Sequence, residues 1–108
     1  MVLIIGGMSQ GKTEFAKTFK DYKILDDLHE IIREKMKSEM SKDEIRDDIF
    51  KMINEKTVIV SNEIGCGIIP IDAFEREYRD FCGEILIDIA RKSDKVYRVV
   101  AGIPEEVK

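Results

Sequence analysis

The first thirteen residues hold the strongest chemical signal in this chain. An apolar run, Val2 to Ile5, leads directly into the G-x-x-x-x-G-K-T motif Gly6-Gly7-Met8-Ser9-Gln10-Gly11-Lys12-Thr13. Glycines allow backbone N–H groups to approach phosphate oxygens, Lys12 would reach the β- and γ-phosphates, and the Thr13 hydroxyl would bind Mg²⁺. A strand before the motif and a helix after it are the setting such a loop needs. The motif therefore predicts a nucleoside triphosphate site, against the alternative of a glycine-rich turn without ligand.

Two carboxylates follow a second short apolar run. Tyr22 to Leu25 reads as a strand that ends at Asp26-Asp27. A carboxylate at this point is typical of phosphate-loop enzymes, where it holds Mg²⁺ or its water shell, and Asp26 is the favoured candidate for metal binding and catalysis. The alternative is that the pair only caps the helix beginning near Leu28, and the two roles are compatible.

Further candidates lie beside these segments. Asn62 and Glu63 follow a strand over 57–61 and adjoin glycines that permit close backbone approach, so we expect Asn62 to contact the nucleotide. Glu63 is a candidate catalytic residue that would contact nucleotide, metal or acceptor, with a surface loop glutamate as the alternative. The sole histidine, His29, is interpreted as a solvated or packing residue.

The periodicity of apolar residues indicates how these segments are positioned. Strands are expected at 2–5, 22–25, 57–61 and 96–100, and helices after Lys12, from Leu28 to about Met40, after a capping box at Ser41 to Glu44, and after Asp72. This alternation predicts an α/β fold, a P-loop NTPase-like three-layer sandwich with a short, mainly parallel sheet, formed by one domain over 1–108. Ligands of such sheets bind at the carboxyl ends of the strands, where 6–13, 26–27 and 62–67 should converge.

Composition excludes several classes of protein. The net charge of −4 and the absence of a basic block argue against nucleic-acid binding. No apolar stretch approaches the roughly 20 residues of a membrane span, and no basic region precedes the first strand, so we expect a cytoplasmic protein. Cys66 and Cys82 lack zinc-site spacing and are interpreted as free thiols.

Three segments carry a family resemblance. Thr57-Val58-Ile59-Val60-Ser61-Asn62-Glu63-Ile64-Gly65-Cys66-Gly67-Ile68-Ile69-Pro70, then Arg79-Asp80-Phe81-Cys82-Gly83, then Asp94-Lys95-Val96-Tyr97-Arg98-Val99-Val100-Ala101-Gly102-Ile103-Pro104 are similar to the bifunctional cobinamide kinase/cobinamide-phosphate guanylyltransferase family. The resemblance implies phosphorylation of the cobinamide aminopropanol hydroxyl and guanylyl transfer through a covalent guanylyl-histidine, on the pathway to cobalamin. It also implies use of ATP or GTP with Mg²⁺ and assembly into a homo-oligomer.

The chain departs from this family pattern at defined places. The segment that holds the guanylylated histidine in the family is missing, because only Lys20 to Lys23 separate the first helix from the acidic strand. His29 follows that strand and does not replace the missing residue, and Leu86-Ile87 stand where an Asn-Gln pair is usual. We therefore expect phosphoryl transfer without guanylyl transfer.

Two function classes follow from these observations. The first is a minimal kinase that transfers the γ-phosphoryl group to cobinamide or a related alcohol. The second is a regulatory nucleotide-binding protein or slow NTPase that has lost this chemistry. Whether ATP or GTP is the nucleotide is left open, because no guanine-reading motif is present.

Overall fold

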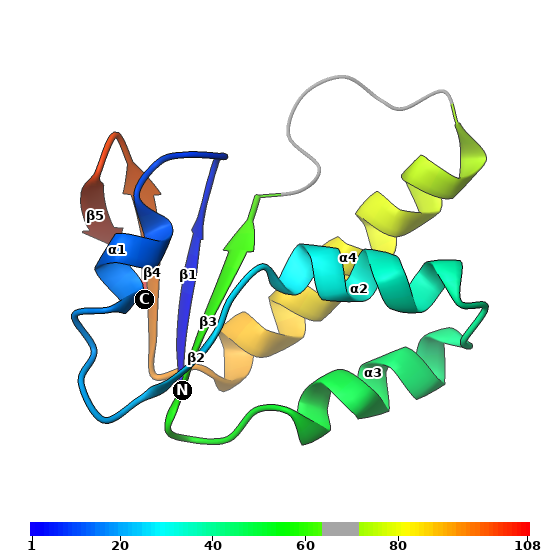
Figure 1. The fold of residues 1–108 in the computed structure, drawn as a ribbon, viewed down its shortest axis with the longest axis horizontal. Helices are drawn as coiled ribbons and strands as arrows, with labels where there is room; N and C mark the ends of the chain where they lie inside the picture. The colour runs from blue at the N-terminus through cyan, green and yellow to red at the C-terminus, as the bar shows by residue number, and fades with distance from the viewer. Residues whose placement is uncertain (64–71) are drawn as a thin grey trace.

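The computed structural model describes residues 1–63 and 72–108 (Figure 1). Within this part of the chain, strands and helices alternate as expected. The elements are β1 (Val2–Gly6), α1 (Lys12–Ala16), β2 (Lys23–Leu25), α2 (Leu28–Lys37), α3 (Lys42–Lys51), β3 (Thr57–Asn62), α4 (Ala73–Lys92), β4 (Lys95–Val100) and β5 (Ile103–Glu106).

The strands form one sheet in the order β2-β3-β1-β4-β5. Strands β2, β3, β1 and β4 are parallel, with Ile4 of β1 opposite Val60 on one side and Tyr97 on the other. Strand β5 is antiparallel to β4. The α/β class and the mainly parallel sheet are thus confirmed, and the carboxyl ends of β1, β2 and β3 lie at the same end of the molecule.

The fifth strand was not expected from the sequence, since Gly102 and Pro104 suggested that regular structure ends after β4. Ala101 and Gly102 have φ of 49° and 77°, which makes a two-residue turn that reverses the chain. Pro104 then lies in an edge strand, where its missing N–H is tolerated.

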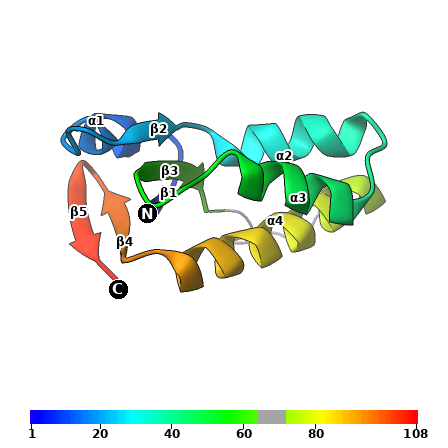
Figure 2. The same ribbon diagram turned by 90° about the horizontal axis from the view of Figure 1, so that it is seen from below.

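Helices cover the two faces of the sheet unequally. Helix α1 lies against one face, where Ala16 packs with Val2, Ile4, Val58 and Val60. Helices α2, α3 and α4 gather on the other side (Figures 1 and 2). Their apolar stripes surround Leu3, Ile59 and Val96, and the fully buried members of this core include Leu28, Ile32, Ile45, Ile49, Phe81, Ile85 and Ile89. Apolar residues alternate between the two faces because successive strand residues point in opposite directions.

Two helix starts follow the sequence signals closely. At Ser41, the hydroxyl accepts from the Glu44 amide at 3.1 Å while the Glu44 carboxylate accepts from the Ser41 amide at 3.4 Å, which confirms the capping box. Asp72 accepts from the amides of Phe74 and Glu75, so it caps α4. Here the reciprocal bond is absent because the Glu75 carboxylate binds Arg33 instead.

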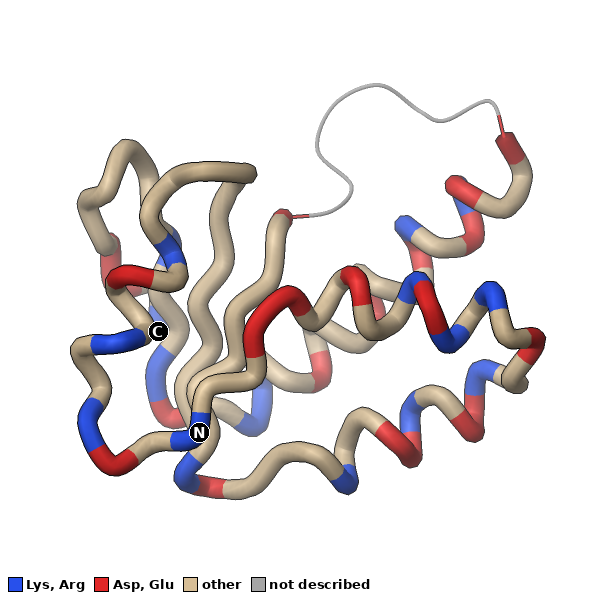
Figure 3. The backbone as a smooth tube through the Cα atoms, in the orientation of Figure 1, with Lys and Arg blue, Asp and Glu red and all other residues tan. Residues whose placement is uncertain are grey.

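Charged residues of both signs are interspersed along α2, α3 and α4 (Figure 3). Several of them join neighbouring helices: Arg33 pairs with Glu75, Arg46 with Asp88, and Lys35 with Asp48 at 3.3 Å. Each exposed pair contributes at most about 1 kcal/mol, so apolar packing remains the main source of stability of this layer. Within the residues that the structure describes, no helix is long and apolar enough to cross a membrane.

Candidate functional site

Two positions of the Gly6–Thr13 loop must be glycine for steric reasons. A Cβ atom on Gly6 would lie 2.6 Å from the Val99 carbonyl oxygen, closer than side chains approach backbone. Gly11 has φ of 93°, and a Cβ there would also lie 3.2 Å from the Gly102 Cα. Gly7 has no such restriction, because the nearest atom to its Cβ would be Gln10 Cγ at 3.6 Å. The first and last glycines of the motif are therefore needed by the fold itself.

The β4–β5 turn fixes the middle of this loop. The Gln10 side-chain oxygen accepts from the Ala101 amide at 2.6 Å, and the Gln10 carbonyl accepts from the Gly102 amide at 2.8 Å. Both amides belong to the tight turn and have no partner within the β4–β5 ladder. The hairpin that the sequence did not predict thus holds the loop in place.

Lys12 lies inside the loop, with only 7% of its surface exposed. Its Nζ donates to the Gly7 carbonyl oxygen at 2.5 Å. A buried ammonium is costly unless its N–H donors are satisfied. Lysine has three such donors, and within the described residues one is used, so the other two remain for a bound anion.

Thr13 and Asp26 lie together, as the sequence predicted for a metal site. The Thr13 hydroxyl donates to Asp26 Oδ2 at 3.1 Å, and Asp26 Oδ1 accepts from the Asp27 amide at 2.9 Å. A hydroxyl oxygen next to a carboxylate is the hard-oxygen pair that Mg²⁺ prefers. These two residues therefore fit a magnesium ion.

The alternative that the acidic pair only caps α2 is wrong. Asp27 occupies the position before the helix with φ of 52°, and its side chain makes no capping hydrogen bond. Asp26 instead accepts from Thr13 and from the Asp27 backbone. Because neither carboxylate makes a capping hydrogen bond to the start of α2, the structure leaves Asp26 available for another role.

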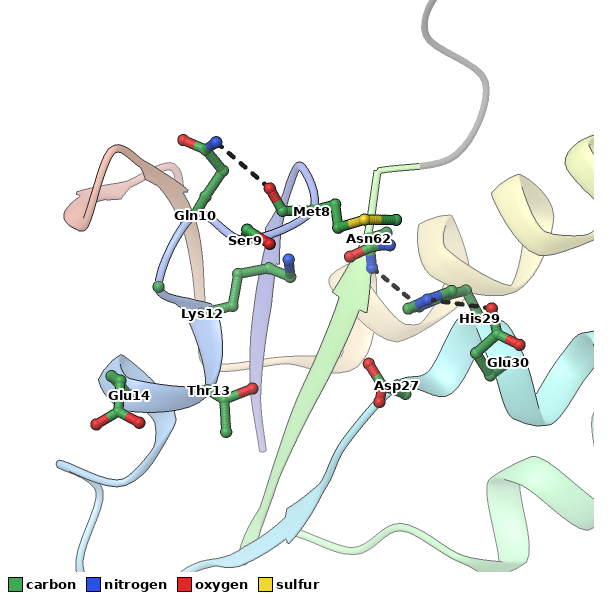
Figure 4. A pocket seen from close by; sticks show the side chains of 11 residues that line it. Met8, Ser9, Gln10, Lys12, Thr13, Glu14, Asp27, His29, Glu30 and Asn62 are labelled. Atoms are coloured by element: carbon green, nitrogen blue, oxygen red, sulfur yellow. Dashed lines mark hydrogen bonds and ion pairs between the residues drawn. The ribbon is translucent and has the colours of Figure 1, made fainter.

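A cavity of about 480 Å³ connects the loop with the start of α2 (Figure 4). It is within the usual size range of ligand sites. It brings together most of the predicted nucleotide-binding residues and four that were not predicted. The lining consists of Met8, Ser9, Gln10, Gly11, Lys12, Thr13, Asn62 and, beyond the predicted set, Glu14, Asp27, His29 and Glu30.

His29 has a more defined environment than its sequence context indicates. It is not solvated: only 6% of its surface is exposed, its Nδ1 accepts from the Asn62 amide at 3.1 Å, and its carbonyl accepts from the Tyr78 hydroxyl at 3.0 Å. Burial lowers the pKa of His29, and the charge of Lys12 adds to this effect despite the nearby carboxylates. The imidazole is therefore neutral at pH 7. Its position two residues after Asp27 was the available signal.

Glu63 is not brought into this cavity. Its carboxylate forms a two-bond ion pair with Arg98, Oε1 to Nε at 3.0 Å and Oε2 to Nη2 at 3.0 Å. It lines a separate, largely apolar hollow between the sheet and α4, together with Ile5 and Leu86. The geometry gives no support to a catalytic role for Glu63, and residues 64–67, which were expected at the ligand-binding end, lie outside the described residues.

Cys82, the cysteine within the described residues, lies in an environment that disfavours reaction. Cys82 is a free thiol, fully buried on α4, and burial raises its pKa to about 12. It is therefore protonated and unreactive at neutral pH. Cys66 falls outside the described residues.

Comparison with known proteins agrees with the geometry of the fold. The cobinamide kinase / cobinamide phosphate guanyltransferase family model matches residues 18–107. The bifunctional adenosylcobalamin biosynthesis protein CobU of Salmonella typhimurium is 40% identical over 53 residues, which are 49% of this chain and 29% of that protein. CobU of Escherichia coli is 38% identical over the same shares, and CobP of Pseudomonas aeruginosa is 36% identical over 49% of this chain and 31% of its own length.

In each case the matched segment spans less than a third of the relative's own length. The family match, by contrast, covers nearly all of this chain, beginning just after the Gly6–Thr13 loop. The chain therefore belongs to the cobinamide kinase / cobinamide phosphate guanyltransferase family, which acts in cobalamin biosynthesis.

Proposed function

We propose that this protein binds a nucleoside triphosphate, ATP or GTP, with Mg²⁺ and transfers the γ-phosphoryl group to the hydroxyl of a cobinamide-type alcohol. The observation that carries the proposal is that the buried Lys12 lines one cavity with Thr13 and that the Thr13 hydroxyl donates a hydrogen bond to Asp26. Phosphoryl transfer depends mainly on positioning and on neutralising charge. A fixed cation beside a set of hard oxygen ligands is suited to both tasks.

The loop supplies the groups that hold the phosphates. The two Lys12 donors that are unused within the described residues would bind β- and γ-phosphate oxygens, with backbone amides of Ser9 to Thr13 around them. Because Gln10 anchors the loop to the β4–β5 turn, these amides are held in place before the nucleotide arrives. Such preorganisation lowers the entropic cost of binding.

Thr13 and Asp26 would hold the magnesium ion. When bound, Mg²⁺ supplies positive charge that offsets the negative charge of the phosphate oxygens. Asp26 receives hydrogen bonds from Thr13 and from the Asp27 amide, so its carboxylate is already oriented. Asn62, at the end of β3, lines the same cavity and would contact the nucleotide.

Guanylyl transfer is not part of the proposed function. A guanylyl-histidine requires an imidazole nitrogen with a free lone pair directed at the α-phosphate. In the sole histidine, His29, the Nδ1 lone pair accepts from the Asn62 amide and Nε2 carries the proton. The short connection between α1 and β2 offers no further histidine.

That short connection favours a second candidate function, a nucleotide-binding protein that hydrolyses its nucleotide slowly. The two candidates share the loop, the metal pair and the nucleotide, and they differ in whether an alcohol receives the phosphoryl group. Turnover that gives only inorganic phosphate in the presence of cobinamide would select the second.

Calorimetric titration of the protein with ATP, GTP and cobinamide in the presence of Mg²⁺ tests the proposal. Lys12→Ala should weaken nucleotide binding by about 1.5 kcal/mol or more, roughly tenfold, because a charge-assisted hydrogen bond is lost. Lys17→Ala is the matched control, since Lys17 is an exposed lysine that pairs only with Glu14 at 3.3 Å in the described structure. Equal affinity of both variants would contradict the proposed site.

A further inference from the structure

The cavity contains a hydrogen-bond donor and an acceptor side by side at the end that faces away from the loop. His29 Nε2 lies 3.7 Å from Glu30 Oε1, and both residues line the cavity across from Lys12 and Thr13 (Figure 4). Neither residue was expected to have a functional role from its sequence context. Their chemistry is determined by the contacts around them.

The backbone of β3 determines which nitrogen of His29 carries the proton. The Asn62 amide donates to Nδ1 at 3.1 Å, and an amide N–H is only a donor. Nδ1 must therefore hold a lone pair, which places the proton of the neutral ring on Nε2. His29 consequently presents a neutral N–H donor, not a base, to the space beside Glu30.

Glu30 supplies the matching acceptor. At 3.7 Å, its carboxylate is too far from Nε2 for a direct hydrogen bond. One oxygen atom can lie about 2.8 Å from both atoms, to one side of the line that joins them. Such an oxygen would accept from His29 and donate to Glu30, and a hydroxyl group combines these two capacities.

The charges around His29 and Glu30 determine which class of compound can bind there. Asp27 and Glu30 both line this part of the cavity, and Asp26 lies beside it. An anionic acceptor such as a carboxylate or phosphate would be repelled by these groups, whereas an uncharged alcohol would not. The pair is therefore suited to a neutral hydroxyl that lies opposite the phosphate loop.

From this geometry we propose that His29 and Glu30 form the binding site for the acceptor hydroxyl, with Glu30 as the base that takes its proton. The inference rests on the proposed kinase function and names residues for its acceptor. In the transfer step, the hydroxyl oxygen forms a bond to the γ-phosphorus. The bond from that phosphorus to the β–γ bridging oxygen breaks, its electron pair leaves with the nucleoside diphosphate, and the hydroxyl proton passes to Glu30.

Four variants separate this role from a structural one. Glu30→Gln removes the base, and Glu34→Gln, one turn further along α2 and outside the cavity, is its control. His29→Gln keeps a donor near the position of Nε2. His29→Asn keeps an acceptor near Nδ1 for the Asn62 amide but loses the outer donor.

The assay follows transfer of labelled γ-phosphate from ATP to cobinamide, and nucleotide affinity is measured in parallel. Glu30→Gln should lower kcat by about 100-fold or more, the usual effect of losing a general base. His29→Asn should raise KM for cobinamide by about tenfold while His29→Gln stays close to the parent. All four variants should bind ATP as the parent does.

Different results would overturn different claims. Normal transfer by Glu30→Gln, or equal KM values for the two His29 variants, would overturn the acceptor site alone. Loss of ATP binding in both His29 variants would also overturn it, because the histidine would then be purely structural. Absence of ATP binding in the parent protein would overturn the proposed function itself. If the parent only hydrolyses ATP, water takes the place of the alcohol, and an unchanged hydrolysis rate in Glu30→Gln would contradict the proposal.

Discussion

Replacement of Gly6 by alanine tests whether the close approach of β1 and β4 requires glycine at the first position of the loop. The added Cβ would lie 2.6 Å from the Val99 carbonyl oxygen and 3.3 Å from Lys12 Cδ, whereas ordinary contacts begin at 3.4 Å. Both β1 and β4 are internal strands of the sheet, so the carbonyl has no free space to move into. The clash must therefore distort the backbone.

The size of the effect follows from this geometry. Forcing an extra methyl group into a packed region costs about 1–3 kcal/mol, and the contact here is with backbone, which favours the upper half of that range. Each kcal/mol corresponds to a fall in Tm of about 4–8 °C in a domain of this size. Gly6→Ala should thus lower Tm by roughly 8 °C or more.

Gly7→Ala is the matched control. Its Cβ would meet only Gln10 Cγ, at 3.6 Å, so we expect less than about 0.5 kcal/mol of change in the free energy of unfolding. Urea unfolding followed by circular dichroism measures both variants. Equal stabilities of Gly6→Ala and Gly7→Ala would refute the reasoning.

Three further predictions concern the cavity. Asp26→Asn should reduce the Mg²⁺ dependence of nucleotide affinity without loss of stability, because the amide oxygen still accepts from Thr13 but lacks the charge. Nucleotide titration with and without Mg²⁺ measures this dependence, and equal dependence in the variant and the parent would argue against a metal role for Asp26. Gln10→Ala should lower the free energy of unfolding by about 1 kcal/mol, because the 2.6 Å hydrogen bond to the Ala101 amide is lost. Hydrogen exchange of the amides in the β4–β5 turn should become faster, and unchanged exchange would contradict the anchoring role of Gln10. Incubation with GTP and Mg²⁺ should leave no covalent GMP on the protein, and a GMP mass on the intact protein that disappears in His29→Ala would prove this expectation wrong.

The elements with strong local signals were predictable. The capping box at Ser41 and the apolar period of α4 each depend on residues that are close together in the sequence, and both are found where expected. Strand β5 was missed because its existence depends on the tight turn at Ala101 and on pairing with β4, and Pro104 is a poor local signal for a strand.

Long-range contacts explain the differences at the candidate site. The pairing of Thr13 with Asp26 could be anticipated because parallel strands place their carboxyl ends together. The contact between His29 and β3 could not, since its partner, the Asn62 amide, is 33 residues away along the chain. Likewise, nothing near Glu63 in the sequence indicates that its carboxylate binds Arg98 rather than a ligand.

Direct transfer of label from [γ-³²P]ATP to cobinamide tests the central claim. With Mg²⁺ present, we expect the label to appear in cobinamide phosphate, and we expect Lys12→Ala to abolish most of this transfer while Lys17→Ala preserves it. Release of the label only as inorganic phosphate, or equal transfer by Lys12→Ala and the parent protein, would contradict the proposed kinase function.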